Sequence, residues 1–168
     1  MTSEHIPDAG DVRRISGRAD FQDAVRTALD EAGAAGWPEL WLCDPDFAHW
    51  PLNDARVIDA LTRWAGAHRR LRLLALDYDG VLRRHPRFVR WRTAWSHLVE
   101  ARALADLQPL DVPVLLLAPG ACSLRLFDPL RFQGRVSRAG ADAASDGELI
   151  DAISQRSSPA FAPTTLGL

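Results

Sequence analysis

The chain has 168 residues, of which 47% are hydrophobic and 25% are charged, and its formal net charge at pH 7 is -2. This length suits one domain, and this composition is typical of a globular protein that needs no disulfide or metal to fold. The small negative charge argues against nucleic acid as the partner, and the complete absence of lysine excludes mechanisms that need a lysine amine.

Cysteine usage and hydropathy predict a cytoplasmic location. Cys43 and Cys122 lie far apart and form no C-x-x-C motif, which is typical of a reducing compartment and argues against structural zinc. The polar start MTSEHIPDAGDV is unlike a leader peptide, and no apolar run approaches the length of a spanning helix. We therefore expect a cytoplasmic protein that has no membrane partner.

The first half of the chain alternates between helical and strand patterns. Asp20 and Asn53 are the expected caps of two helices, and Pro86 fits the first turn of a third. The hydrophobic spacing predicts, in chain order, a helix over 20–33, a buried strand over 39–46, a helix over 53–66, a strand over 71–78 and a helix over 86–98.

The second half of the chain consists mostly of predicted strands. Its patterns predict a strand over 99–104, a hairpin over 113–128, a short edge strand over 133–140 and a final helix over 144–157. We expect a single domain over 1–157, followed by an extended tail over 158–168. The apolar end of that tail, from Phe161 to Leu168, is a candidate contact for a partner protein.

This order of elements predicts the fold class α/β. Two successive strand–helix units favour a parallel sheet with both faces covered, and the hairpin adds antiparallel strands. We therefore expect a single-domain sandwich with a mixed, partly parallel sheet and helices on both faces.

Acidic side chains follow the first two predicted strands. Asp44, Asp46 and His49 come after the first strand, and Asp77 and Asp79 come after the second. Parallel α/β sheets bind ligands at the carboxyl ends of their strands. If the two strands are neighbours, all these groups share one edge of the sheet.

The stretch LLALDYDGV resembles the first motif of the haloacid dehalogenase superfamily, an apolar strand that ends in D-x-D-G-T/V. The resemblance implies Asp77 as the nucleophile, Asp79 as the general acid and a magnesium ion held by the pair. The chain lacks the lysine that clamps phosphate in that family, and the acidic segment around Asp146 is more typical of a helix cap. The alternative is structural: the carboxylates cap helices and pair with Arg83 and Arg84.

The run RRHPRFVRWR contains five arginines and no acid. Arginine clusters bind phosphate groups, so the run predicts a site for an anionic or phosphorylated ligand. In the alternative, Phe88, Trp91 and Trp95 pack in the core while the arginines stay in water or pair with aspartates. The candidate ligand-binding residues are Arg83, Arg84, Arg87, Arg90 and His97.

Two strand–helix units, a hairpin and a final helix resemble one half of the phospholipase D-like fold. The equivalent hairpin here, VPVLLLAPGACSLRLFD, has neither residue of the H-x-K motif, so the resemblance implies a version that has lost its nucleophile. The segments LWLCDPDF, WPLND, RHPRFVRWR, WSHLVEARAL and TTLGL resemble a mainly proteobacterial family of uncharacterised proteins. That second resemblance carries over no catalytic residues.

The favoured hypothesis is a non-catalytic phospholipase D-like module that binds an anionic or phosphorylated ligand, or regulates through it, and uses no cofactor. The competing hypothesis is a magnesium-dependent phosphohydrolase of the haloacid dehalogenase type that uses Asp77 and Asp79.

Overall fold

The computed structural model describes residues 11–163. The strands in this part of the chain are β1 (Val12–Ser16), β2 (Glu39–Cys43), β3 (Arg70–Ala75), β4 (Val99–Ala103), β5 (Val114–Ala118), β6 (Cys122–Asp128), β7 (Gln133–Ser137) and β8 (Ser158–Pro159). The helices are α1 (Arg18–Ala35), α2 (Ala55–Trp64), α3 (Asp79–Arg84), α4 (Pro86–Ala94) and α5 (Gly140–Ser154), with one 3₁₀ turn over Pro109–Asp111.

All the strands belong to one mixed sheet, in the order β1–β7–β6–β5–β2–β3–β4–β8. The three strands β2, β3 and β4 run parallel to one another, because helices connect them. Every other pair of neighbours is antiparallel. The predictions of an α/β class and of a mixed, partly parallel sheet are therefore confirmed, and the first two predicted strands are indeed neighbours.

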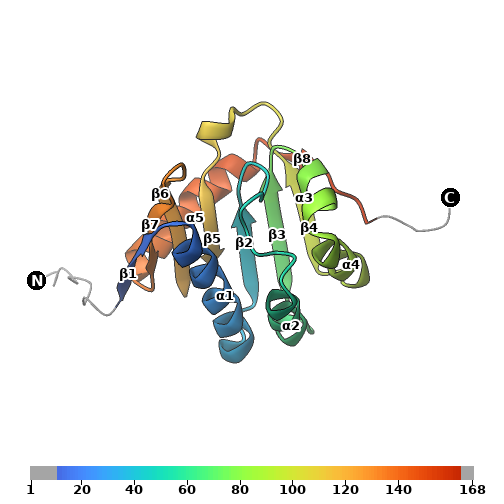
Figure 1. Cartoon of the computed structure of the whole chain (residues 1–168), viewed down its shortest axis with the longest axis horizontal. Coiled ribbons are helices and arrows are strands. Elements are labelled where there is room, and N and C mark those ends of the chain that lie inside the picture. The colour runs from blue at the N-terminus through green and yellow to red at the C-terminus, as the bar shows by residue number, and fades with distance from the viewer. Residues whose placement is uncertain (1–10, 164–168) are drawn as a thin grey trace, which may run out of the picture.

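Helices cover both faces of the sheet, as predicted: α1, α2 and α4 lie on one face and α5 on the other (Figure 1). The side chains of a strand alternate between faces, so each central strand serves two cores. Leu40 and Leu42 of β2 pack toward the larger core with α1, α2 and α4. Trp41 and Cys43 pack toward the smaller core under α5. This division explains why β2 and β3 appear in the sequence as nearly continuous apolar runs.

The predicted start and end of the first helix are wrong. The helix α1 begins at Arg18, and it continues past Gly33 to Ala35, where Gly36 adopts a left-handed conformation and ends it. Asp20 lies inside the first turn rather than at the cap. Its carboxylate accepts a hydrogen bond from the backbone N–H of Ser16 and pairs with Arg13.

The predicted cap of the second helix is also wrong. Asp54 caps α2, accepting a hydrogen bond from the N–H of Arg56. Asn53 instead stabilises the start of α4, since its side-chain oxygen accepts a hydrogen bond of 3.0 Å from the backbone N–H of Arg87. The loop before α2 therefore fixes the start of α4, and the two helices are coupled at their N-terminal ends.

Strand β1 was not predicted, and it changes the place of the segment after the hairpin. Because β1 pairs antiparallel with β7, the predicted edge strand near 133–140 is an interior strand, and that prediction is wrong. The final helix begins at Gly140 rather than at 144 and ends at Ser154. The short helix α3 was also not predicted.

The described part of the tail, residues 158–163, lies against the domain. Ser158 and Pro159 form β8 on the outer side of β4, and the N–H of Ala160 donates to the carbonyl of Ala101. The Phe161 ring stacks on Tyr78 with centroids 4.9 Å apart. The start of the predicted partner-binding segment thus packs on its own chain, while the rest of that segment lies outside the described residues.

Candidate functional site

The turn after β2 is organised around Asp44. Its carboxylate accepts hydrogen bonds from the backbone N–H groups of Asp46 and Phe47 and from the indole N–H of Trp50. Burial raises the pKa of Asp44, and the three donors oppose that rise because they favour its ionised form. With its oxygens engaged in this way, Asp44 orders the loop rather than facing a ligand.

The DYDG segment forms a turn that leads into α3. The exposed Asp77 accepts a hydrogen bond of 3.2 Å from the N–H of Asp79, and the exposed Asp79 is the first residue of α3. Between them, the buried Tyr78 donates its hydroxyl to the carbonyl of Arg102. Across residues 11–163, no group of three or more His, Cys, Asp or Glu side chains is placed to hold a metal ion. The predicted magnesium site thus gains no third protein ligand within this range.

Arginines in the α3–α4 region differ from those elsewhere in the protein. Twelve of the twenty arginines form ion pairs with Asp or Glu. Among the described residues, no carboxylate pairs with any of the five arginines between positions 83 and 92. The alternative in which Arg83 and Arg84 pair with strand-end aspartates is therefore not what the structure shows.

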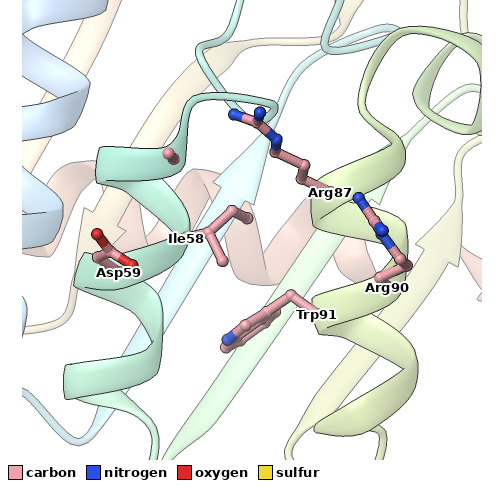
Figure 2. A pocket seen from close by; sticks show the side chains of 6 residues that line it. Ile58, Asp59, Arg87, Arg90 and Trp91 are labelled. Atoms are coloured by element: carbon pink, nitrogen blue, oxygen red, sulfur yellow. The ribbon is translucent and has the colours of Figure 1, made fainter.

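A groove of about 400 Å³ runs between α2 and α4, and we call it the α2–α4 groove. It is lined by Ala55, Ile58, Asp59, Arg87, Arg90 and Trp91. Figure 2 shows Arg87 and Arg90 extending from α4, Asp59 on the facing helix α2, and Ile58 and Trp91 between the two helices. The groove therefore has cations on one wall, an acid on the other and an apolar floor.

Two hydrogen-bonding features belong to the residues that line this groove. The indole N–H of Trp91 is buried and has no hydrogen-bond partner among the described residues. A buried donor without a partner costs free energy, which a bound acceptor would recover. The Arg87 side chain is directed by the loop before α2, since its guanidinium donates to the carbonyl of Asn53 at 3.4 Å.

The other predicted ligand-binding residues lie outside the groove wall. Arg83 and Arg84 are exposed on α3, and the Arg84 guanidinium folds back over Gly80 of the same helix. His97 is exposed in the turn between α4 and β4, with its ring 5.9 Å from that of Trp95. The structure thus brings Arg87 and Arg90 to one groove and leaves the other three beside it.

Sequence reasoning missed two residues of this region. The expectation that Trp91 packs in the core is confirmed, but its place in the lining of the α2–α4 groove was not predicted. Arg92 belongs to the run whose arginines were expected to bind a ligand, stay in water or pair with aspartates, but only 4% of it is exposed. A signal was present for Arg92, because it lies four positions after the buried Phe88 and therefore on the same side of the helix.

Asp146 was interpreted as part of a cap of the final helix, and that interpretation is wrong. It lies within α5, where only 1% of its side chain is exposed. Its carboxylate accepts hydrogen bonds from Ser123, from Arg125 at 2.8 Å and from Arg135 at 3.1 Å. These contacts join α5 to strands β6 and β7.

Neither cysteine is placed to act as a nucleophile. Cys43 and Cys122 are both buried, and neither forms a disulfide. Burial raises the pKa of Cys43 far above its usual range and that of Cys122 to about 11. Both thiols are therefore protonated at neutral pH.

Within residues 11–163, no helix has the length and apolar composition needed to cross a bilayer.

Comparison with known proteins supports the fold alone. The architecture defines the class, a mixed α/β protein built on one sheet. No protein-family model matches the chain, and no curated protein sequence matches it. A similar solved structure is that of TrmBL2, described as an archaeal chromatin protein with a novel mode of DNA binding. The TM-score is 0.63 at 17% sequence identity, and the likeness covers 93% of this chain and 56% of TrmBL2.

Proposed function

We propose that this protein is a non-catalytic binding or regulatory module that takes a small phosphorylated ligand in the α2–α4 groove. The observation that carries the proposal is the absence of any paired carboxylate along the arginine run within the described chain, although ion pairs engage most other arginines. Arg87 and Arg90 stand on the groove wall with their charge uncompensated within the described fold. A phosphate group would supply that compensation through charge-assisted hydrogen bonds.

The remaining groove residues narrow the ligand class. Ile58 and Trp91 offer an apolar surface against which a ring can pack, and the indole N–H offers a hydrogen bond. Asp59 on the opposite wall would repel a ligand that is anionic throughout, but it would accept hydrogen bonds from hydroxyl or amino groups. The groove thus suits a small organic phosphate that carries hydroxyl or amino groups away from its phosphate.

The resemblance to one half of the phospholipase D-like fold belongs to the same proposal. The hairpin of β5 and β6 takes the place of the catalytic hairpin in this assignment, and it holds neither histidine nor lysine. Without these residues a covalent phospho-histidine intermediate cannot form on that hairpin. We also propose that the chain belongs to the mainly proteobacterial family of uncharacterised proteins that its sequence resembles.

Calorimetric titration of a panel of phosphate esters tests the proposal. A wild-type ligand should bind the double variant Arg87→Gln/Arg90→Gln at least about tenfold more weakly, since charged hydrogen bonds contribute roughly 1.5–3 kcal/mol each. Wild-type affinity should also fall as salt rises. Arg14→Gln removes an exposed arginine that also pairs with no carboxylate in the described fold, but on β1, and should bind like wild type. Equal affinity in all three proteins would overturn the assignment of the groove.

Two other ligand classes enter the same measurements. TrmBL2, whose fold is similar, is described as binding DNA, so a short DNA duplex belongs in the panel, against our expectation from net charge. The phosphohydrolase hypothesis predicts magnesium-dependent release of phosphate that disappears in Asp77→Asn. Turnover of that kind would replace the binding-module proposal, because Asp77 would then act as the nucleophile.

A further inference from the structure

A second pocket lies beside α4, between strand β4 and the tail. Its volume is about 460 Å³, which is within the range of small-molecule sites. Its walls are mostly apolar and include Val99, Ala101, Pro159 and Ala160. We call it the tail pocket. Among the described residues, it shares no lining residue with the α2–α4 groove.

The one cation among the described residues of this pocket is Arg92, from the last turn of α4. Only 4% of the residue is exposed, and no carboxylate pairs with it in the described part of the chain. Its Nη2 donates to the carbonyl of Phe161 at 3.1 Å, whereas Nε and Nη1 are buried and have no partner there. A guanidinium stays charged at all ordinary pH values, so the described fold buries a positive charge without a counter-ion.

The tail forms the outer wall of the pocket and is held there by Arg92 itself. Besides the hydrogen bond to its carbonyl, the Phe161 ring lies 5.6 Å from the Arg92 guanidinium carbon. Phe161 adopts a left-handed backbone conformation with φ of 49°, which a side chain with a Cβ disfavours. Its contacts with Arg92 and Tyr78 therefore hold a strained residue over the pocket.

The second charged lining residue, Glu100, does not neutralise Arg92. Its carboxylate lies within 4 Å of Arg70, Arg72 and Arg102, at 3.8, 3.9 and 3.5 Å respectively. Three arginines thus already share that one negative charge. An anion that enters the tail pocket meets a buried cation with donors to spare and a carboxylate that is screened by its own partners.

We propose that the tail pocket binds a small aliphatic carboxylate, with its carboxyl group on Arg92 and its alkyl chain along the apolar wall. One guanidinium matches the single charge of a carboxylate and can donate to both of its oxygens. A phosphate dianion would need more donors than this pocket offers, and the surface of Val99 and Ala101 would leave its remaining oxygens unsatisfied. This site is separate from the groove proposed above and needs no activity there.

Hexanoate is the probe, with hexanol as its uncharged counterpart and inorganic phosphate as its polar counterpart. Binding to the full chain is measured by calorimetry and by the shift in melting temperature at constant ionic strength. We expect hexanoate to bind and to raise the melting temperature, and we expect hexanol and phosphate to do neither at the same concentration. Absence of hexanoate binding, or stronger binding of phosphate that depends on Arg92, would overturn the proposal.

Two variants and one control assign any binding to this pocket. Arg92→Met removes the cation and should weaken hexanoate binding by about tenfold or more. Ala160→Leu keeps the cation but fills part of the pocket, so it should cause a similar loss even where Arg92→Met fails to fold. The control Arg14→Met removes an exposed arginine of β1 that lines neither the tail pocket nor the α2–α4 groove, and should bind hexanoate like wild type. Hexanoate binding that is unchanged in Ala160→Leu would contradict the site.

Discussion

Two arginine-rich regions of the molecule differ in what compensates their charge. On the α5 side, Arg125 and Arg135 direct their guanidinium groups to the buried carboxylate of Asp146. On the α4 side, five arginines follow one another in α3 and α4, and none pairs with a carboxylate in the described chain. Both regions are rich in arginine and pack on the same sheet, but carboxylates of the described fold neutralise the arginines only on the α5 side.

This difference separates arginines that hold the fold together from arginines that are available to a ligand. A buried carboxylate with two guanidinium partners is costly to disturb, because removal of one member leaves the other charges unpaired. An exposed arginine without a partner loses little when it is replaced, because water already solvates it. The comparison therefore predicts large effects on stability around α5, and effects on binding rather than stability for the exposed arginines of α3 and α4, from which the buried Arg92 is set apart.

The largest effect is expected for Asp146→Asn. The substitution keeps the shape of the side chain but leaves Arg125 and Arg135 without their shared negative charge. We expect the free energy of unfolding to fall by about 3 kcal/mol, as measured by urea denaturation.

The matched control is Asp142→Asn, one turn earlier on α5. Asp142 accepts a hydrogen bond from Ser137 and lies 3.6 Å from Arg135, but its side chain is 36% exposed. Asp142→Asn should therefore lower the free energy of unfolding clearly less than Asp146→Asn does. A similar small loss in both variants would remove the distinction between the two arginine regions.

A pH effect of intermediate size is expected from His85, at the junction of α3 and α4. The residue is buried, its Nε2–H donates to the carbonyl of Phe47, and its Nδ1 has no partner among the described residues. Burial, assisted by the nearby charge of Arg84, lowers the pKa of His85 below its usual value. The unfolded chain therefore binds the proton more readily than the folded one.

The stability contributed by neutral His85 is present above the ordinary histidine pKa of 6.5 and is lost as pH falls below it. Between pH 7.5 and 5.5 this loss amounts to at most about 1.4 kcal/mol. Urea denaturation at both values should show the loss in wild type and in His97→Gln, but a smaller one in His85→Gln. An equal loss in all three proteins would place the titration elsewhere.

A smaller effect, about 1 kcal/mol, is expected from Asn53→Ala. The substitution removes the oxygen that accepts the Arg87 N–H at the start of α4. Asn53→Asp keeps such an oxygen and should retain wild-type stability in urea denaturation. Because the same loop directs the Arg87 guanidinium, Asn53→Ala should also weaken phosphate-ester binding, whereas an unchanged affinity would separate the cap from the groove.

Much of the fold could be predicted from the sequence, because the relevant patterns are local. β2, β3 and the β5–β6 hairpin appear as apolar runs bounded by acids, prolines or glycines, and Pro86 does begin α4. Strand β1 could not be predicted in the same way, since VRRIS buries only Ile15. It becomes a strand because it pairs with β7, which is more than a hundred residues away in the chain.

The candidate site was only partly predictable, for a similar reason. The arginine run is visible in the sequence, but which arginines find a carboxylate depends on packing between distant elements. Arg135 meets Asp146 because β7 lies under α5. Arg87 is held by Asn53, 34 positions earlier, which accepts hydrogen bonds from its backbone N–H and its guanidinium. The groove itself forms only where α2 and α4 pack side by side (Figure 2).

The smallest effect on stability is expected for Arg90→Gln, and this result decides how the arginine run is understood. Arg90 has no carboxylate partner in the described fold, so the free energy of unfolding should change by no more than about 0.5 kcal/mol. The paired control is Arg26→Gln. Because the Arg26 guanidinium lies 2.8 Å from the carboxylates of both Asp23 and Asp54, this substitution should lower the free energy of unfolding by more than Arg90→Gln does.

Both variants are measured by urea denaturation and by titration with the phosphate ester that binds wild type. Reduced affinity in Arg90→Gln at unchanged stability would show that Arg90 binds the ligand. Replacement of an arginine that mainly stabilises the fold would lower the free energy of unfolding as well. If Arg90→Gln instead destabilises the protein as much as Arg26→Gln, its charge is compensated within the fold. The contrast between the α4 and α5 regions would then fail at the residue on which the α2–α4 groove depends.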